Sequence, residues 1–511
     1  QDAGGITAQT TAALSIHGGR GRDGMTALNG MDVSNAFSAG AGQMFGLVSD
    51  GAVEEMSIEV AGHDAEAQYG GVTVNLIPRE GANQFSGGFF GTFTGAGLQG
   101  DNLSSDLAAR GVTNFPQVDE VWLISPSVGG PLVEDRLWFF AQHTSQRGNV
   151  QNPGVFAATN AAAPFYTPDT SSPVVSVNEN TETSFNFTWQ ASSKDKFNVY
   201  YSNANWKKPN ALAGPFRTFI IAPEASINRV FSVNTTQISW VRPATNRLLF
   251  EAGSSFAPGV AKDLPNANAA LDVYSRFEIA TRTIHRNSHF LAQGTGYTSN
   301  RATNSFYGSA SYVTGTHNLK IGFNGSTFQE MIPDNFSQQN YTDAVAIMGL
   351  PLQAGFTIPN LSDNQGIAWG FYAQDQMTFD RLTVNAGLRF DHLGNSYPDQ
   401  TRAASVWEPA GLTVQGNDSV VNWNDLNPRL GVVYDVTGNG KTALKASFNR
   451  YGTRSNSEWA VLLNPASSTP LRQSARVWLD GAAGHPFAGI PAVFPGCIPS
   501  ASDPTGSSCI A

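Results

Sequence analysis

The chain has 511 residues, of which 41% are hydrophobic, 11% are aromatic and only 14% are charged, and its formal net charge at pH 7 is −10. An average soluble domain carries about 25% charged residues, so something other than charge covers much of this surface. The negative charge and the lack of a basic stripe exclude nucleic acid as a partner, and apolar runs no longer than VWLI and LWFFA exclude a protein that spans a membrane with helices.

Residues 1–83 are predicted to form a small α/β domain. The opening QDAGGITAQT lacks the basic and apolar regions of a signal peptide, so we expect a mature chain or a fragment. AALSIHGG, MTALNGMDV and VEEMSIEVAG are typical of short strands between glycine-rich turns. Alternation places Glu55 and Glu59 opposite Met56 and Ile58, as on a solvated strand face, rather than as a general acid/base pair. With no serine or cysteine nucleophile in a recognisable elbow, we expect no enzyme.

From residue 84 onward, apolar and polar residues alternate with a period of two. In TSFNFTWQ the residues Phe185, Phe187 and Trp189 share one face, and Ser184 and Asn186 lie on the other. KFNVYYSN, HNLKIGFN, RLTVNAGLRFD and TALKASFNRY repeat this pattern. The period predicts a long series of β-strands with one apolar face. A border between the two domains is therefore expected near residues 83 to 85.

The connections between these strands alternate between short and long. Polar turns occur at 134–136, 192–195, 315–316, 380–381 and 437–440, whereas long loops are expected at 149–180, 207–229, 329–365 and 393–426. This asymmetry is typical of a transmembrane β-barrel with short periplasmic turns and long extracellular loops. A soluble β-sandwich or propeller also alternates, but it does not explain the rhythm of the connections or the aromatic content.

Residues 84–511 are thus predicted to form an all-β, antiparallel transmembrane barrel. We count roughly fourteen strands of an expected twenty-two or so. The pattern fades after Tyr451, and the wall would need further residues to close, because lipid cannot satisfy an open edge. We therefore expect an internal fragment of a larger protein. The two cysteines, Cys497 and Cys509, are candidates for a loop disulfide; two free thiols are the alternative.

Several stretches of this chain resemble TonB-dependent outer-membrane receptors, and most closely their Oar-like branch, in which a carboxypeptidase-regulatory-like domain often precedes the plug. The resemblance rests on AVEEMSIEVAGHDAEAQYGGVTVNLIPREGANQFSGGFFGTF (52–93), VGGPLVEDRLWFFAQHTSQRG (128–148), GFYAQDQMTFDRLTVNAGLRFDH (370–392) and NWNDLNPRLGVVYDVTGNGKTALKASFNRYG (422–452). It covers both predicted domains and implies that residues 1–83 are part of a plug.

The resemblance also implies partners and contacts. The family is energised by the TonB–ExbB–ExbD complex, lies in outer-membrane lipid and binds an extracellular ligand. The resemblance implies no cofactor.

Plug arginines in the family often face carboxylates of the wall, which makes Arg20 and Arg22 candidates for plug-to-barrel contacts, with solvated loop arginines as the alternative. Asn29 stands where the family usually has Asp before Gly, and both residues tolerate the same turn. The family's TonB box, first plug strands and last barrel strands cannot be matched.

Two further motifs have a simpler explanation than a functional site. GRGRDG (19–24) fits the GxGxxG pattern, but no long amphipathic helix follows that could hold a pyrophosphate, and GAGLQG (95–100) lies in a loop. His285 and His289 have the spacing of a metal pair only if they are helical. In a strand they lie too far apart for one ion, so we expect no metal site.

Aromatic residues in the long loops are candidates for ligand binding, because sugars and peptides stack on aromatic faces. We select Trp206, Phe336, Tyr341 and Trp407, with an interfacial aromatic girdle or loop packing as the alternative.

The resemblance predicts import of a bulky oligosaccharide, peptide or chelate through a plugged barrel. A surface scaffold or protein-export conduit without small-solute import is the main alternative. An ungated porin is disfavoured because residues 1–83 resemble a plug.

Overall fold

The computed structural model describes residues 21–36, 48–60, 62–100, 103–110, 116–211, 213–216, 219–270, 275–287, 297–333, 341–347, 350–357, 361–402, 404, 410–467 and 473–477. Within these ranges, no helix is long and apolar enough to cross a membrane.

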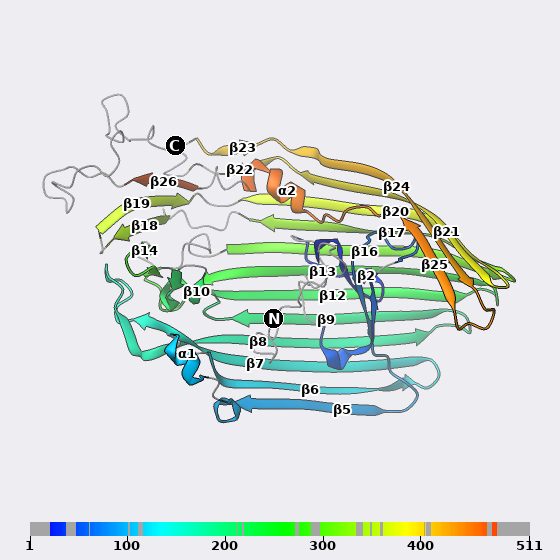
Figure 1. The fold of residues 1–511 in the computed structure, drawn as a ribbon, viewed down its shortest axis with the longest axis horizontal. Coiled ribbons are helices and arrows are strands. Elements are labelled where there is room, and N and C mark those ends of the chain that lie inside the picture. The colour runs from blue at the N-terminus through cyan, green and yellow to red at the C-terminus, as the bar shows by residue number, and fades with distance from the viewer. Residues whose placement is uncertain are drawn as a thin grey trace.

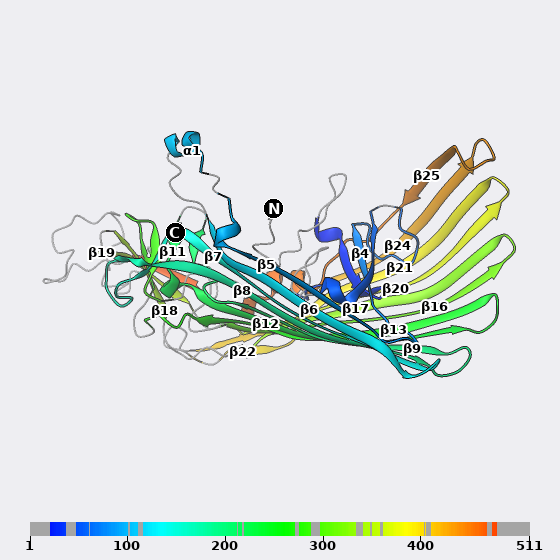
Figure 2. The ribbon, with the colours of Figure 1, turned by 90° about the horizontal axis from the view of Figure 1, so that it is seen from below.

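Thirteen antiparallel strands form one large sheet, here called the wall, in which nearly every strand pairs with its neighbours in the chain. Figures 1 and 2 show the wall as a curved trough, with β5 and β25 as its two edges. The strands are β5 (Ser86–Gly95), β6 (Gln117–Val133), β7 (Leu137–Ala158), β8 (Pro168–Gln190), β9 (Lys196–Lys208), β12 (Ile227–Pro243), β13 (Leu248–Pro265), β16 (Tyr297–Thr314), β17 (His317–Ile332), β20 (Ser362–Phe379), β21 (Leu382–Tyr397), β24 (Asn417–Asp435) and β25 (Ala443–Asn449).

The antiparallel wall of outward apolar residues predicted from the sequence is confirmed. On β8, Phe185 is 39% exposed on the outer face, while its neighbour Ser184 is 3% exposed on the inner face. The same alternation exposes Ile321 of β17 and Phe371 of β20. The described residues contain thirteen wall strands, close to the roughly fourteen expected, and after β25 the chain enters the short helix α2 (Glu458–Leu463).

The outer face changes character along the strands. Near the short turns it is apolar, and toward the long loops it carries amides that bond from strand to strand. Asn203 Nδ2 donates to Asn234 Oδ1 at 2.8 Å, and Gln329 Nε2 donates to Asp363 Oδ1 at 3.1 Å. A membrane-spanning strand needs only about 9–11 residues, so these strands of up to 23 residues extend beyond the apolar band on the long-loop side.

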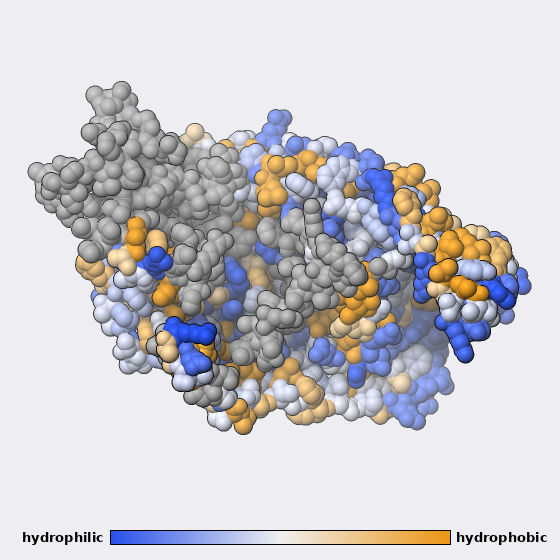
Figure 3. All heavy atoms as spheres, in the orientation of Figure 1, coloured by the Kyte–Doolittle hydropathy of each residue, from blue (hydrophilic) through white to orange (hydrophobic). Residues whose placement is uncertain are grey.

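Figure 3 shows the concave side of the trough, where hydrophilic and hydrophobic residues are mixed. Hydrophobic residues gather over β25 at the short-turn end, where Leu444 and Phe448 are exposed. Six of the seven side chains of β25 are exposed, so both faces of this strand are open to the surroundings.

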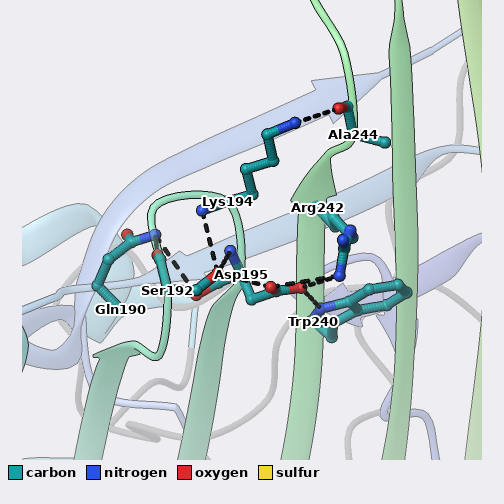
Figure 4. A network of polar contacts seen from close by, with 7 residues as sticks. All are labelled: Gln190, Ser192, Lys194, Asp195, Trp240, Arg242 and Ala244. Atoms are coloured by element: carbon teal, nitrogen blue, oxygen red, sulfur yellow. Dashed lines mark hydrogen bonds and ion pairs between the residues drawn. The ribbon is translucent and has the colours of Figure 1, made fainter.

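The short turns are held by side chains of neighbouring strands (Figure 4). In the turn between β8 and β9, the carboxylate of Asp195 accepts bonds from Ser192 Oγ at 2.6 Å, Trp240 Nε1 at 3.1 Å and Arg242 Nη1 at 3.1 Å. Lys194 Nζ donates to Ala244 O in the next turn at 2.6 Å. The bond from Ser192, together with those from Trp240 and Arg242, lowers the pKa of Asp195.

The long loops are shorter than expected where strands run on. β7 continues to Ala158 and β8 begins at Pro168, so the loop expected at 149–180 is only 159–167. The other three expected loops contain short strands or helices of their own. A further long connection, 266–296, joins β13 to β16. Smaller elements in the connections are η3 (Ala96–Leu98), α1 (Ser105–Ala109), η4 (Pro223–Ala225), β22 (Gln400–Arg402), β23 (Leu412–Val414) and η5 (Pro465–Ser467).

Segments of different loops combine into a second sheet of seven strands, here called the loop sheet, at the end opposite the short turns. Its order is β10-β11-β15-β14-β18-β19-β26, and the pairs β11/β15 and β14/β18 are parallel. The strands are β10 (Gly214–Phe216), β11 (Phe219–Ile221), β14 (Arg276–Glu278), β15 (Thr283–His285), β18 (Tyr341–Ile347), β19 (Leu350–Thr357) and β26 (Gln473–Val477).

A third, four-stranded sheet lies inside the trough (Figure 2) and is called the inner sheet. Its order is β2-β1-β4-β3, with β1 parallel to β4, and its turns include η1 (Gly21–Asp23) and η2 (Asp50–Ala52). The strands are β1 (Met25–Leu28), β2 (Met31–Asp32), β3 (Val53–Glu59) and β4 (Thr73–Pro78). Asn29 and Gly30 turn the chain between β1 and β2 with φ of 51° and 75°, which both residues tolerate.

The inner sheet packs on the wall through a small apolar cluster. Leu28, Val33 and Leu76 are buried together with Tyr200 of β9. The inner sheet ends at Pro78 and the wall begins at Ser86.

Candidate functional site: the contact between the inner sheet and the wall

The loop 62–72, which leads into β4, lies against β17, β20, β21 and β24 of the wall. Arg389 of β21 is completely buried at this contact. Its Nε donates to Asp391 Oδ1 and its Nη2 to Asn324 Oδ1, both at 2.6 Å. Its Nη1 donates to the backbone oxygens of Ala65 at 3.4 Å and Glu66 at 3.1 Å. One wall arginine therefore bonds to both the wall and the inner loop.

Neighbouring wall residues bond to the same loop. Gln374 accepts a bond from Ala65 N at 2.8 Å and donates one to Asp64 Oδ2 at 3.1 Å. Asn324 Nδ2 donates to Glu66 O at 2.9 Å, and Lys320 forms an ion pair with the Glu66 carboxylate. Side-chain bonds thus hold this loop at its backbone as well as at its charges.

Arg429 of β24 extends the contact toward the edge of the wall. Its Nη2 donates to Ala67 O at 3.1 Å, and its guanidinium lies 3.8 Å from the ring centre of Tyr451. Tyr451 Oη donates to His63 O at 3.0 Å, and His63 in turn contacts Gly71 O through Nε2 at 2.9 Å. A cation over an aromatic face and two bonds to backbone oxygens therefore fix the start of the loop.

The segment 450–457 follows β25 and lies beside the inner sheet. Arg454, completely buried at its side chain, donates to Asp32 Oδ2 at 2.5 Å and to Gly24 O at 2.8 Å, and lies 5.1 Å from the ring centre of Tyr69. Burial raises the pKa of Tyr69, so the phenol remains protonated at neutral pH. Ser457 Oγ donates to Ala36 O at 2.8 Å. We call all these contacts, from Lys320 to Ser457, the arginine side.

On the opposite side, the inner sheet meets β6, β7 and β8 through small neutral groups. Ser49 Oγ lies 2.5 Å from Thr144 Oγ1. Gln142 Nε2 donates to Ser49 Oγ at 3.2 Å and to Ser125 Oγ at 3.1 Å. Nearer the short turns, Asn186 Nδ2 donates to Arg79 O at 2.7 Å. We call this contact the neutral side.

Of the ligand-binding candidates, only Trp206 has a described side chain. It lies on the inner face of β9, in register with the buried Tyr200 and Ser202, and not on the outer face with Tyr201. Its ring centre is 4.7 Å from that of Phe231, and its Nε1 donates to Asn178 Oδ1. Trp206 is therefore placed inside the trough near the long loops rather than in an outward aromatic girdle.

The remaining candidates lie partly or wholly outside the described residues. Tyr341 is the first residue of β18, and Arg22 lies in η1, but their side chains are not described. Phe336, Trp407, Arg20, Cys497 and Cys509 lie outside the described residues altogether. His285 lies in β15 and His289 is not described; within the described ranges, no three His, Cys, Asp or Glu side chains could hold a metal.

The sequence reasoning missed the wall residues that make the contact. It named only Arg20 and Arg22 of the inner domain as candidates, and these stay a prediction; Arg389, Arg429 and Arg454 of the wall part, which face the inner sheet, were not named. One signal was available: Arg389 and Asp391 lie two apart in the predicted strand, so they share one face, while Leu388 and Phe390 lie on the other. A buried pair of opposite charges at such positions points to a polar partner inside the barrel.

A wide antiparallel wall with an apolar outer face and a polar inner face that binds a small second sheet has the features of an outer-membrane β-barrel protein. Comparison with known proteins supports this class. Residues 155–509 match the family model described as "Outer membrane beta barrel domain", so the chain belongs to this family and is a protein of the bacterial outer membrane.

Relatives and solved structures refine the comparison. The TonB-dependent transporter Oar from Myxococcus xanthus is 31% identical over 91 residues, which are 17% of this chain and 8% of that protein. The outer membrane transporter YddB from Escherichia coli has a TM-score of 0.59 at 11% identity, covering 87% of this chain and 55% of its own. A variant of the ferric enterobactin receptor PfeA from Pseudomonas aeruginosa has a TM-score of 0.55 at 13% identity, and the match covers 89% of this chain and 57% of the PfeA chain.

The chain thus spans little more than half the length of these structures and a small part of the curated relative. The structures share the fold, and the matching segment of Oar confirms the resemblance to TonB-dependent receptors of that branch. The relatives are transporters and receptors, not enzymes.

Proposed function

We propose that the protein is a TonB-dependent receptor that binds a bulky substrate outside the cell and imports it through a plugged barrel. In this proposal residues 1–83 belong to the plug and residues 84–511 to the barrel. The observation that carries the proposal is the arginine side, where buried wall side chains donate to backbone oxygens of the inner sheet.

Such a contact suits a plug that must stay docked at rest and still be movable. The charge-assisted bonds of Arg389 and Arg454 hold the plug in place. Water can replace polar bonds when the plug moves, whereas a large apolar contact would resist exposure. A pull from the periplasmic side by the TonB–ExbB–ExbD complex could therefore rearrange the plug without unfolding the wall.

The substrate would be an oligosaccharide, a peptide or a chelate held near the loop sheet. Trp206, Phe336, Tyr341 and Trp407 are the proposed contacts. Trp206 supports this role because it is only partly buried on the inner face at the mouth of the trough. Cys497 and Cys509 are proposed to close a loop disulfide.

The first test of this function is to purify the full-length protein from native outer membranes and identify what remains bound by mass spectrometry. We expect a small solute whose uptake by cells stops when TonB is deleted or a protonophore is added. A stoichiometric surface or secreted protein, with no TonB-dependent solute uptake, would contradict import and favour a scaffold or export conduit.

A second test addresses the plug. Deletion of residues 1–83 should raise the ion conductance of the protein in planar bilayers, because the inner sheet fills the trough. Unchanged conductance would contradict the plug assignment.

A further inference from the structure

A cavity of about 550 Å³ lies between the inner sheet and the neutral side of the wall. Asp50 and Arg79 border it from the inner sheet, and Phe90, Gln146, Asn180 and Glu182 from β5, β7 and β8. It is large enough for several ring-sized groups of a solute. The cavity opens where the inner sheet is held by small neutral side chains rather than by arginines.

Two side chains that line this cavity are buried without partners. Glu182 is 2% exposed and Asn180 is 3% exposed, yet neither amide atom of Asn180 and neither carboxylate oxygen of Glu182 makes a hydrogen bond of ordinary geometry. The groups nearest to the Glu182 carboxyl are Ser184, Tyr200 and the Ser49 backbone, and their contacts with it are weak. Gln142, on the same inner face and 2% exposed, bonds to Ser49, Ser125 and Ser184. Leaving a buried polar group unpaired destabilises a fold by about 1–3 kcal/mol, so Glu182 and Asn180 have no purely structural explanation.

The chemistry of the lining favours a solute rich in hydroxyl groups. Asn180 and Gln146 both donate and accept, Glu182 and Asp50 accept, and Ser125, Ser127 and Thr144 add hydroxyls. Sugar hydroxyls, which donate and accept, match this mixture, and the ring of Phe90 offers a flat apolar surface for a pyranose face. Among the described lining residues Arg79 is the only cation, and it already contacts Glu54 and Val53 O. An anionic solute is therefore disfavoured.

We propose that this cavity is a saccharide-binding site between the plug and strands β6–β8, with Asn180 and Glu182 as its central hydrogen-bonding groups. The proposal rests on the proposed import function, and it narrows the substrate to a carbohydrate or a solute with a carbohydrate part. A polar cavity holds solvent, which the hydroxyls of the sugar replace as they bond to Asn180 and Glu182.

The test is calorimetric titration of the full-length protein in detergent with unbranched malto- and cello-oligosaccharides of increasing length. We expect the native protein to bind one of these series. In the double variant Asn180→Leu/Glu182→Leu, we expect affinity to fall at least tenfold while the unfolding temperature stays equal or rises, because the groups removed make no hydrogen bond of ordinary geometry in the fold. Thr188→Val, on the same face of β8 but outside the cavity lining, is the matched control and should bind normally.

Two results would overturn the proposal: no binding of either series by the native protein, or unchanged affinity in the double variant. If the sugars fail to bind but TonB-dependent uptake of another solute is found, the cavity site fails and the import function stands. If the sugars bind through Asn180 and Glu182 but no uptake depends on TonB, the site stands and the import function fails.

Discussion

The two sides of the inner sheet differ in how they meet the wall. On the arginine side, Arg389, Arg429 and Arg454 are fully or partly buried and bond to at least four backbone oxygens of the inner sheet and its loop. On the neutral side, hydroxyls and amides make the contact, and a cavity with two unpartnered polar side chains lies beside it. The same sheet is thus anchored on one side and loosely held on the other.

This difference suggests where a plug would move. Charge-assisted bonds are roughly twice as strong as neutral ones, so the neutral side should separate from the wall first under a pull. The saccharide site proposed above lies on that side. Binding and movement would then use the same part of the interface, while the arginine side acts as the fixed edge.

The largest expected effect is the loss of the arginine side. Arg389→Leu leaves Asp391 buried without its cation, which should lower the free energy of unfolding by about 3–5 kcal/mol. It should also raise ion conductance, because Ala65 and Glu66 lose their donor. Denaturant unfolding and planar-bilayer recordings measure the two effects.

Arg381→Leu is the control for this change, because Arg381 is half exposed in the turn between β20 and β21. It should leave both readings near the native values. Equal effects of the two substitutions would show that burial at the arginine side has no special role.

A second pair of substitutions sharpens the comparison within the neutral side. Gln142→Leu removes bonds to Ser49, Ser125 and Ser184 and should lower the free energy of unfolding by about 1–3 kcal/mol. Asn180→Leu should not lower it, because the amide has no partner to lose. Thermal unfolding of both variants measures these effects. If Asn180→Leu lowered the stability as much as Gln142→Leu, the contrast between the two side chains would be wrong.

A pH change can destabilise the loop sheet without directly altering the arginine side or the neutral side of the inner sheet. Burial, together with the charges of Arg276 and Arg286, lowers the pKa of His285 to about 4. An unfolded histidine titrates near 6.5. As pH falls from about 6.5 toward 4, the unfolded form therefore binds a proton that the folded form does not, and the loop sheet loses stability. Above about 6.5 the effect vanishes.

Glu224 works in the opposite direction, because burial raises its pKa and its protonation favours the folded form at low pH. Tyr166 lies beside His285 but does not titrate in this range. The protection factors of the loop-strand amides, which correct hydrogen exchange for its intrinsic pH dependence, should fall between pH 6.5 and 4 in the native protein and fall less in His285→Gln. An unchanged profile in the variant would rule out His285 as the cause.

The smallest effect is expected at the short turns. Asp195→Asn removes a carboxylate that accepts from Ser192, Trp240 and Arg242 in an exposed turn (Figure 4). Because solvent screens such contacts, the unfolding temperature should change only slightly. The lowered pKa of Asp195 means that its contribution is present near neutral pH and fades as pH falls below its unfolded value. A large change would show that turns, and not the inner contacts, dominate stability.

Much of the wall could be predicted because its signals are local. The two-residue period of TSFNFTWQ and HNLKIGFN places alternate side chains in lipid and in the interior. The extension of β7 to Ala158 was missed, because NPG at 152–154 interrupts the alternation. The loop sheet was missed because its strands are short and pair across distant parts of the chain, as Ile221 does with Ile284.

The site was harder to predict than the fold for a related reason. Which wall residue faces the inner sheet depends on the strand register across the whole wall, so only a same-face pair such as Arg389 and Asp391 leaves a mark in the sequence. The missing partners of Glu182 and Asn180 cannot be read from any pattern, because they depend on the shape of the space between two sheets.

The central claim, that the plug separates from the neutral side and stays on the arginine side, can be tested with two cross-links in a background without Cys497 and Cys509. Ser49→Cys/Thr144→Cys would join the plug to β7, since the two hydroxyl oxygens are 2.5 Å apart. Ala65→Cys/Gly387→Cys would join it to β21: a Cβ built at position 387 lies 2.8 Å from that of Ala65, so the two backbones must move apart slightly to reach the Cβ separation of about 3.5–4.5 Å that a disulfide needs. We expect the first cross-link to block TonB-dependent uptake until a reductant is added and the second to leave uptake intact; the reverse pattern would contradict the claim.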